Sequence, residues 1–145
     1  MWIFEGNEFT SDMIDDNFGF VYEITDLDNG KKYIGKKWFW NTRKRPPLKG
    51  KTRKRIVRVE SDWLKYYGSS EEVKSLVEDA GTERFNREIL RLCKTKGECT
   101  YFEAKLQFDN DVLLKDEYYN NFIGCKIHSK HVSTLKNDGS RSSDT

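Results

Sequence analysis

The residues most suited to binding chemistry are cations gathered between positions 31 and 58. This segment holds thirteen Lys and Arg side chains in 28 residues and no Asp or Glu, which leaves the other 117 residues with 13 basic and 24 acidic side chains. The same segment contains Trp38, Phe39 and Trp40. Because cations bind phosphates and flat rings stack on bases, the segment predicts a nucleic-acid partner. The alternative interpretation is a solvated basic loop whose aromatic residues serve only the fold.

The length of 145 residues predicts one domain. Only 36% of the residues are hydrophobic and 34% are charged, but twenty aromatic rings argue against a disordered chain. No apolar run is long enough for a membrane span, and the N-terminus does not resemble a secretory signal. Three cysteines exclude a disulfide framework, so we expect a cytoplasmic protein without membrane partners.

The local patterns predict an α/β (α+β) fold with a small central antiparallel sheet of three strands flanked by helices. Asn29-Gly30 predicts the turn of a β-hairpin, because this dipeptide favours the backbone geometry of tight hairpin turns. Apolar spacing and capping residues predict the helices, with Ser61 and Ser69 as N-caps. The expected strands are 18–25, 32–38 and 85–92, and the expected helices are 61–67, 70–80 and 96–108.

Three segments are expected to lie outside these elements. Residues 1–16 are interpreted as an N-terminal extension, and residues 17–125 as the domain. Pro46-Pro47 forbids a helix, so residues 41–58 are expected to form an extended basic loop. Residues 126–145 are polar with few apolar anchors and are expected to be a disordered tail.

The predicted hairpin resembles the two-part signature of the GIY-YIG endonuclease family. Its first element is Phe20-Val21-Tyr22, where Phe20 replaces the usual glycine, and its second element, Tyr33-Ile34-Gly35, matches fully. Glu103 on a later predicted helix and Asn120 near the end continue the family order, so the resemblance covers about residues 18–121. Residues 61–70 are similar to a phage-encoded subgroup of the family, whose members would act in the host cytoplasm.

The resemblance implies a role for each matched position. Glu103 would hold a Mg²⁺ ion, or Mn²⁺, since magnesium accepts a single carboxylate and keeps most of its waters. Tyr22 or Tyr33 would orient or deprotonate the attacking water, provided that neighbouring lysines lower the tyrosine pKa. The full catalytic set is Tyr22, Tyr33, Lys36, Arg43 and Asn120; the DNA-binding set is Lys37, Lys44, Arg45, Arg53, Lys54 and Arg55; Trp63, Tyr66 and Ser69 are further site candidates.

Several alternatives remain open at this stage. Glu88 and Glu98 are rivals of Glu103, although a capping box already explains Glu98. Asn121 is a one-residue alternative to Asn120, and other cations crowd the position of Arg43. Many family members carry a histidine after the arginine, but this chain has only His128 and His131. That role is therefore absent or is filled by another residue, such as Lys36, Lys37 or Tyr66. With Cys125 these histidines make a weak zinc motif, because structural zinc prefers four ligands.

Two geometric expectations follow for the hairpin. Side chains alternate across a strand, so both tyrosine hydroxyls should emerge on the sheet face that carries Glu103 and Arg43. The missing side chain of Gly35 should leave room for a phosphate beside the backbone. The predicted function is a divalent-metal-dependent endonuclease, phage-encoded, that acts on double-stranded DNA. The alternative is a non-catalytic nucleic-acid-binding module that uses the basic loop.

Overall fold

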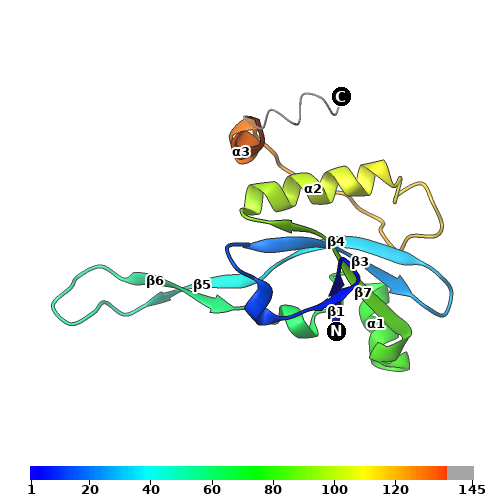
Figure 1. The fold of residues 1–145 in the computed structure, drawn as a ribbon, viewed down its shortest axis with the longest axis horizontal. Coiled ribbons are helices and arrows are strands. Elements are labelled where there is room, and N and C mark those ends of the chain that lie inside the picture. Colours follow the sequence, from blue (N-terminus) through cyan, green and yellow to red (C-terminus); the bar gives the residue numbers. More distant parts are fainter. Residues whose placement is uncertain (137–145) are drawn as a thin grey trace.

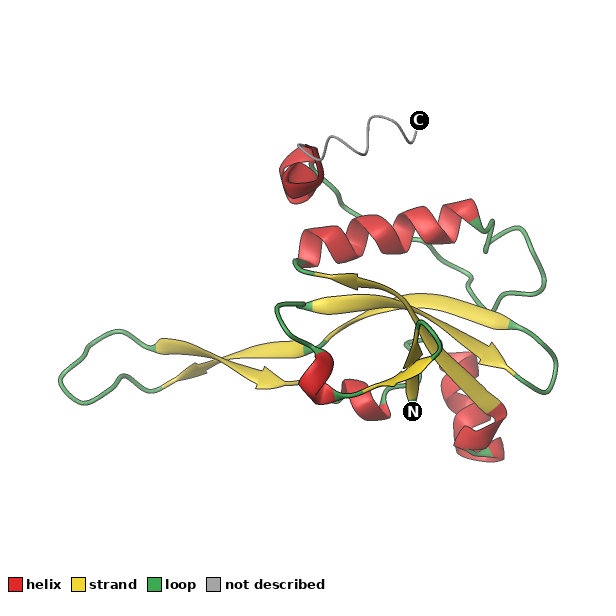
Figure 2. Ribbon diagram, viewed as in Figure 1, coloured by secondary structure: helices red, strands yellow, loops and turns green. Residues whose placement is uncertain are grey.

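A five-stranded mixed sheet forms the centre of the protein, whose computed structural model describes residues 1–136 (Figure 1, Figure 2). The strand order is β2-β1-β7-β3-β4, and every neighbouring pair is antiparallel except β1 and β7, which run parallel. The strands are β1 (Trp2–Phe4), β2 (Asn7–Phe9), β3 (Gly19–Asp26), β4 (Lys32–Trp38) and β7 (Phe85–Cys93). The three predicted strands are therefore confirmed as β3, β4 and β7, in a sheet that is larger than predicted.

The N-terminal residues belong to this sheet, so their interpretation as an extension was wrong. Strand β1 pairs with β7, and the side chain of Trp2 is only 1% exposed. Its indole Nε1 donates a hydrogen bond of 2.7 Å to the carbonyl oxygen of Trp63. The paired residues, such as Trp2 and Arg87, lie 85 positions apart with no tight turn joining the two strands, so the local sequence carries no signal for this parallel pairing.

Helices cover both faces of the sheet. Helix α2 (Lys96–Asp109) lies along one face, where Val21, Ile34 and Phe102 are buried (Figure 1). Helix α1 (Glu71–Ala80) lies below the opposite face, and its Val73 joins the larger core. Aromatic side chains dominate that core, which contains Trp2, Phe9, Phe20, Tyr22, Phe39, Phe85, Trp63 and Tyr119. Alternation along β3 places neighbouring residues in different cores, as Phe20 and Tyr22 lie in the larger one and Val21 in the other.

The basic segment forms a projecting β-hairpin, which corrects the expectation of an irregular loop. Strands β5 (Trp40–Arg45) and β6 (Arg55–Glu60) pair antiparallel in a separate two-stranded sheet. The hairpin, residues 40–60, extends away from the rest of the protein and is called the arm below (Figure 2). Pro46-Pro47 lies just beyond β5, where a missing N–H costs no strand pairing. The strand character comes from Ile56, Val57 and Val59.

The remaining elements differ from the predictions at their ends. The expected helix over 61–67 is a single 3-10 turn, Trp63–Lys65, because the Ser61 hydroxyl bonds to the carbonyl of Trp38 instead of capping a helix. Helix α1 is capped by Ser70 rather than Ser69. Contrary to the expected disorder, residues 129–136 form a 3-10 turn (Ser129–Val132) and the short helix α3 (Ser133–Lys136), and positions 137–145 of the predicted tail lie outside the described residues. Within residues 1–136, no helix has the length and apolarity to span a bilayer.

Candidate active site

Strand β4 carries most of the predicted site residues at the edge of the central sheet. Tyr33, Gly35 and Lys37 share one face of the strand, and Ile34 and Lys36 share the other. Tyr33 packs with the aromatic core below the sheet, whereas Lys36 contacts Glu103 on helix α2 above it. The expectation that Glu103 and the two tyrosine hydroxyls share one face was therefore wrong. The candidate groups approach the strand edge from its two sides.

Tyr22 lies across the backbone of β4 at Gly35. Its side chain is 0% exposed, and its hydroxyl has no hydrogen-bond partner among the described residues. A Cβ added at Gly35 would contact the Tyr22 hydroxyl and lie 2.7 Å from Cζ of the same ring. The glycine therefore makes room for Tyr22 rather than for a phosphate, which corrects the expectation from the sequence. Burial raises the pKa of Tyr22 well above its usual value.

Tyr33 and Lys37 complete a group that we call the tyrosine cluster: Tyr22, Tyr33, Lys37, Tyr66 and Ser69. The Tyr33 hydroxyl is 2.8 Å from Oγ of Ser69. Nζ of Lys37 lies 4.2 Å from the centre of the Tyr66 ring, and the Tyr66 and Tyr22 ring centres are 6.0 Å apart. The sequence-predicted candidates Tyr66 and Ser69 thus lie beside the two signature tyrosines.

The environment of the tyrosines keeps their hydroxyls protonated. Burial raises the pKa of Tyr33, and the hydrogen bond with Ser69 offsets only part of that effect. The neighbouring lysines do not reverse the shift, because Lys37 pairs with Asp62 at 2.7 Å and Lys36 pairs with Glu103. The suggestion that Lys36 and Lys37 lower a tyrosine pKa was wrong. Tyr33, which is partly exposed, is suited to orient a water molecule as a neutral hydroxyl, whereas the Tyr22 hydroxyl is enclosed by the core.

Glu103 is the carboxylate through which helix α2 contacts β4. Its Oε1 lies 2.9 Å from Nζ of Lys36, and the two side chains are 13% and 27% exposed. The rival Glu98 is used by the fold, since its carboxylate accepts bonds from the Lys94 amide and the Thr134 hydroxyl. The other rival, Glu88, lies in β7 opposite Glu23.

A metal ion at this position would depend on one protein carboxylate. Among residues 1–136, no three or more His, Cys, Asp or Glu side chains lie close enough together to hold a metal. The weak zinc motif of Cys125, His128 and His131 is therefore not assembled as a metal site. Magnesium is often bound by one or two carboxylates, several waters and substrate phosphates. The partly exposed carboxylate of Glu103 fits that mode of binding, provided that Lys36 gives way.

Asn120 contacts backbone rather than the open site. Its amide oxygen accepts from the Ile34 N–H at 3.0 Å, and its Nδ2 donates to the Ile34 carbonyl at 2.8 Å. Gln107 donates to the same carbonyl at 2.9 Å. Both residues therefore fix the position of β4 between Tyr33 and Gly35, and the catalytic role that the resemblance implies for Asn120 stays a prediction. Sequence reasoning missed Gln107, although it lies one helical turn after Glu103 on the same face of α2.

The other predicted site residues lie elsewhere. Trp63 is fully buried in the aromatic core, and its Nε1 donates to Glu60 at 2.9 Å. Arg43 is exposed in β5 opposite Val57, and no described contact joins it to Tyr22, Tyr33 or Glu103. The predicted DNA-binding residues other than Lys37 are also exposed on the arm: Lys44, Arg45, Arg53, Lys54 and Arg55.

Comparisons with known proteins agree with this arrangement. A family model described as "Putative endonuclease segE, GIY-YIG domain" matches residues 2–123. The protein named "Putative endonuclease segE" from Enterobacteria phage T4 is 30% identical over 105 residues, which cover 71% of this chain and 40% of that relative. No solved structure matches the chain. Because the matched range contains the hairpin, the arm, Glu103 and Asn120, the chain belongs to the GIY-YIG endonuclease family, in the group represented by the SegE domain.

Proposed function

We propose that this protein is a divalent-metal-dependent DNA endonuclease that hydrolyses phosphodiester bonds. One observation carries the proposal: a single edge strand, β4, presents the Tyr33 hydroxyl and Lys37 on one face and Lys36, which contacts the Glu103 carboxylate at 2.9 Å, on the other. Phosphodiester hydrolysis needs an oriented water, a metal-binding carboxylate and positive charge near the phosphate, and these side chains offer each of them. The family membership supports the same reaction class.

Each group has a role that follows from its environment. Glu103 would hold Mg²⁺ or Mn²⁺, and the ion would act as a Lewis acid on the phosphate when bound. Tyr33 would orient the attacking water through its neutral hydroxyl, since burial keeps its pKa raised. Lys36, once separated from Glu103, would place its charge beside the phosphate. Asn120 and Gln107 would hold the strand that carries these groups.

The cations of the arm support double-stranded DNA as the substrate. Nine Lys and Arg side chains occur between residues 41 and 58, and no acidic residue interrupts them. Contacts of this kind to phosphates supply most of non-specific DNA affinity. Arg43, which the resemblance places in the catalytic set, would clamp a phosphate with its guanidinium, and the DNA would have to connect its position on the arm to the β4 edge.

One observation favours a second candidate, a nucleic-acid-binding module that does not cleave. Lys36 already neutralises the Glu103 carboxylate, which is the proposed metal ligand. If this ion pair persists when DNA binds, no metal can use Glu103. The chain would then bind nucleic acid through the arm alone.

Nicking of supercoiled plasmid separates the two functions. The proposed enzyme relaxes the plasmid with Mg²⁺ or Mn²⁺, is inactive with EDTA, and loses cleavage in Glu103→Gln while keeping DNA affinity. Glu88→Gln is the matched control, because it also removes one carboxylate charge, from strand β7 instead of helix α2. This variant should cut normally. A wild-type protein that binds DNA but nicks with neither ion would support the binding module instead.

A further inference from the structure

The arm leaves the domain in a fixed direction, because its base is tied to the core. The amide of Ser61 donates to the carbonyl of Phe39 at 2.8 Å, and the Ser61 hydroxyl donates to the carbonyl of Trp38 at 2.6 Å. The carboxylate of Glu60 accepts from Ser11 at 2.6 Å and from the Trp63 indole at 2.9 Å. Because Phe39 is fully buried and directly follows β4, these contacts also fix the arm relative to the candidate active site.

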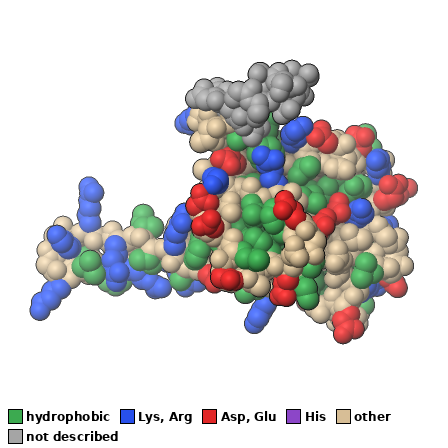
Figure 3. Space-filling model, in the orientation of Figure 1, with side chains coloured by type: hydrophobic (Ala, Val, Ile, Leu, Met, Phe, Trp, Pro, Cys, Tyr) green, Lys and Arg blue, Asp and Glu red, His purple; other side chains and the backbone are tan. Residues whose placement is uncertain are grey.

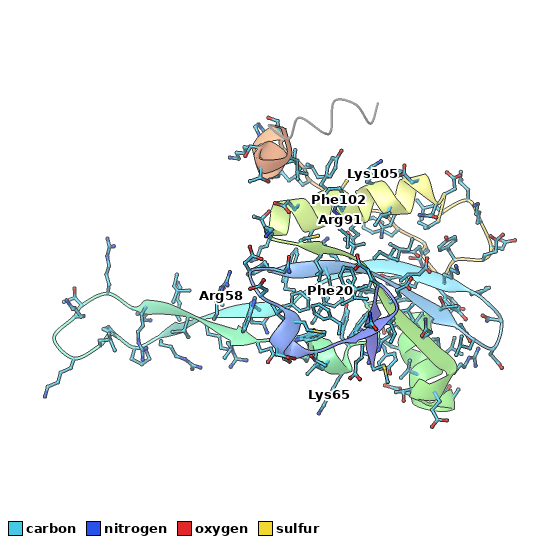
Figure 4. All side chains as sticks on the ribbon, viewed as in Figure 1. Phe20, Arg58, Lys65, Arg91, Phe102 and Lys105 are labelled. Atoms are coloured by element: carbon cyan, nitrogen blue, oxygen red, sulfur yellow. The ribbon has the colours of Figure 1, made fainter. Side chains whose placement is uncertain are left out.

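One arm cation belongs to this anchor. The Arg58 guanidinium lies 5.3 Å from the centre of the Phe18 ring and 5.9 Å from that of Trp40. Figure 4 shows Arg58 where the arm joins the body. These cation–π contacts hold the Arg58 guanidinium against two rings of the protein. Arg58 is therefore the arm cation least available to a partner.

The outer part of the arm has no such support. Residues 41–56 are all exposed, and two-stranded hairpins without cover are marginally stable in water. Arg45 and Arg55 lie directly opposite each other in the ladder, where like charges repel. The arrangement is unfavourable in the protein alone and would be relieved by an anion close to both guanidinium groups.

The cations lie on both faces of the ribbon and at its tip. Alternation places Arg43, Arg45 and Arg55 on one face and Lys44 on the other. Figure 3 shows Lys and Arg side chains on opposite sides of the arm as well as at its end. The tip loop adds Lys49, Lys51, Arg53 and Lys54. A ribbon that lay flat on one DNA strand would need cations on one face only, whereas a ribbon inside a groove has phosphates on both sides.

The dimensions select one groove. Six-residue strands are about 20 Å long, and the major groove of B-form DNA, about 12 Å wide, admits a two-stranded ribbon. We infer that the arm inserts into the major groove of double-stranded DNA, with its two faces toward the flanking phosphate backbones. Leu48, which lies in the tip loop and is 57% exposed, would then face the base edges, where thymine methyl groups offer apolar contact. The inference depends on the proposed function in one respect, which is the choice of DNA as the partner of the arm.

A comparison of duplex DNA with duplex RNA tests the groove. Both are measured with Glu103→Gln, so that cleavage does not interfere, on duplexes of equal length and charge. A-form RNA has a deep and narrow major groove that excludes a ribbon, so we expect affinity at least about tenfold lower for RNA. Equal affinity for the two duplexes would overturn the inference, because it would mean that only backbone charge is recognised.

Methylation interference identifies the groove directly. Dimethyl sulfate modifies guanine N7 in the major groove and adenine N3 in the minor groove. We expect guanine N7 methylation to reduce binding over the sequence that the arm covers. Interference at adenine N3 alone, or at neither position, would contradict insertion into the major groove.

Variants of the arm connect these results to its residues. Arg45→Gln with Arg55→Gln should weaken duplex DNA binding about tenfold, because two phosphate contacts are lost. The melting temperature should stay the same or rise, because the like-charge pair is removed. Lys74→Gln with Lys105→Gln is the matched control, since it removes two exposed cations from the body. Equal loss of affinity in both double variants would overturn the inference.

The outcomes are separable from those of the nicking assay. A protein that fails to nick but binds duplex DNA with guanine N7 interference refutes the nuclease and keeps the groove inference. A protein that nicks normally, with affinity independent of Arg45 and Arg55, refutes the groove inference and keeps the nuclease.

Discussion

Nζ of Lys36 lies 2.9 Å from Oε1 of Glu103, so the carboxylate predicted to bind the metal already has a cationic partner. The pair also joins β4 to helix α2, with both side chains partly buried. The metal ion proposed for Glu103 would therefore have to compete with Lys36 for this carboxylate. A single substitution tests that competition.

Lys36→Met should lower the metal concentration needed for half-maximal cleavage. An ion pair of this exposure contributes up to about 1 kcal/mol, so we expect a shift of up to about fivefold. The maximal rate should fall, because the variant loses a charge beside the phosphate. Titration of Mg²⁺ and Mn²⁺ in the nicking assay measures both quantities.

Lys32→Met is the matched control for this prediction. Lys32 is also on β4 and pairs with Glu23 at 3.5 Å, away from Glu103. Its metal midpoint should equal that of the wild type. An unchanged midpoint in Lys36→Met would mean that the metal does not use Glu103.

Tyr33→Phe and Tyr22→Phe should show whether the two hydroxyl groups contribute to cleavage, separately from the packing of the two rings. Each substitution keeps the ring, and loss of a positioned acid–base hydroxyl typically costs about 10²–10⁴-fold in rate. The Tyr22 hydroxyl is buried without a described partner, so Tyr22→Phe should keep or raise the stability, by up to about 1 kcal/mol. Single-turnover cleavage and thermal unfolding measure the two effects.

Tyr101→Phe provides the control for the two tyrosine variants, because Tyr101 lies on α2 and packs against Phe102. It should cleave at the wild-type rate. Wild-type cleavage by both Tyr22→Phe and Tyr33→Phe would refute a role of these hydroxyls in the reaction.

Gly35→Ala should disrupt the site through Tyr22. The new methyl group would lie 2.7 Å from Cζ of the Tyr22 ring, and overpacking of this kind typically costs about 1–3 kcal/mol. The melting temperature and the cleavage rate should both fall. The double variant with Tyr22→Phe should recover part of the stability, since it removes one of the clashing atoms. Normal stability of Gly35→Ala would show that the ring can move away.

Local patterns in the sequence predicted the elements whose signals are local. Asn29-Gly30 marked the hairpin, and Thr95 with Glu98 marked the start of α2. The pairing of β1 with β7 could not be predicted, because it depends on contacts distant in sequence. The strand character of the arm was hidden by its charges and by Pro46-Pro47, although Ile56, Val57 and Val59 are residues that favour strands.

The sequence indicated which residues gather at the candidate site, but not how their side chains are oriented there. The family order identified Tyr33 and Glu103, which the fold brings to the same strand edge. Sequence could not indicate that Asn120 binds backbone, because an amide can serve a ligand or a strand equally well. Nor could it give the direction of the tyrosine pKa shifts, which depends on burial in the folded protein.

Acid should destabilise the fold through Asp26. This carboxylate is fully buried and accepts bonds from Arg84 at 2.7 and 2.8 Å and from the Tyr119 hydroxyl at 2.6 Å. The Arg84 hydrogen bonds lower the pKa of Asp26 to about 2. A pKa below the unfolded value stabilises the fold above about pH 4, and this contribution, about 2 kcal/mol, is lost as the pH falls toward 2.

Denaturant unfolding between pH 2 and pH 6 measures the contribution of Asp26. Asp26→Asn should be less stable than the wild type at pH 6, and the difference between the two proteins should shrink as the pH falls to 2. Asp109→Asn is the control, because Asp109 is exposed and, within residues 1–136, pairs only with Lys105 on the same helix. A constant difference between Asp26→Asn and the wild type over this range would contradict the low pKa.

Salt dependence should reveal how many arm cations meet phosphates. Each phosphate contact contributes about −0.9 to the slope of log affinity against log salt on duplex DNA. Five or six contacts by the nine cations of residues 41–58 would give a slope of about −5, so binding should collapse between low and moderate salt. Replacing Arg53, Lys54 and Arg55 by Gln should flatten the slope by about three if all three contact phosphate.

Removal of three cations from the body is the matched control. Lys74, Lys105 and Lys115 are exposed outside the arm, and their replacement by Gln changes the net charge equally. If long-range attraction by net charge caused the salt dependence, both triple variants would flatten the slope alike. Direct contact at the arm tip predicts a change only in the variant of Arg53, Lys54 and Arg55, because counterions are released only from the phosphates that the protein contacts. An unchanged slope in the arm variant would mean that the tip of the arm does not reach the DNA.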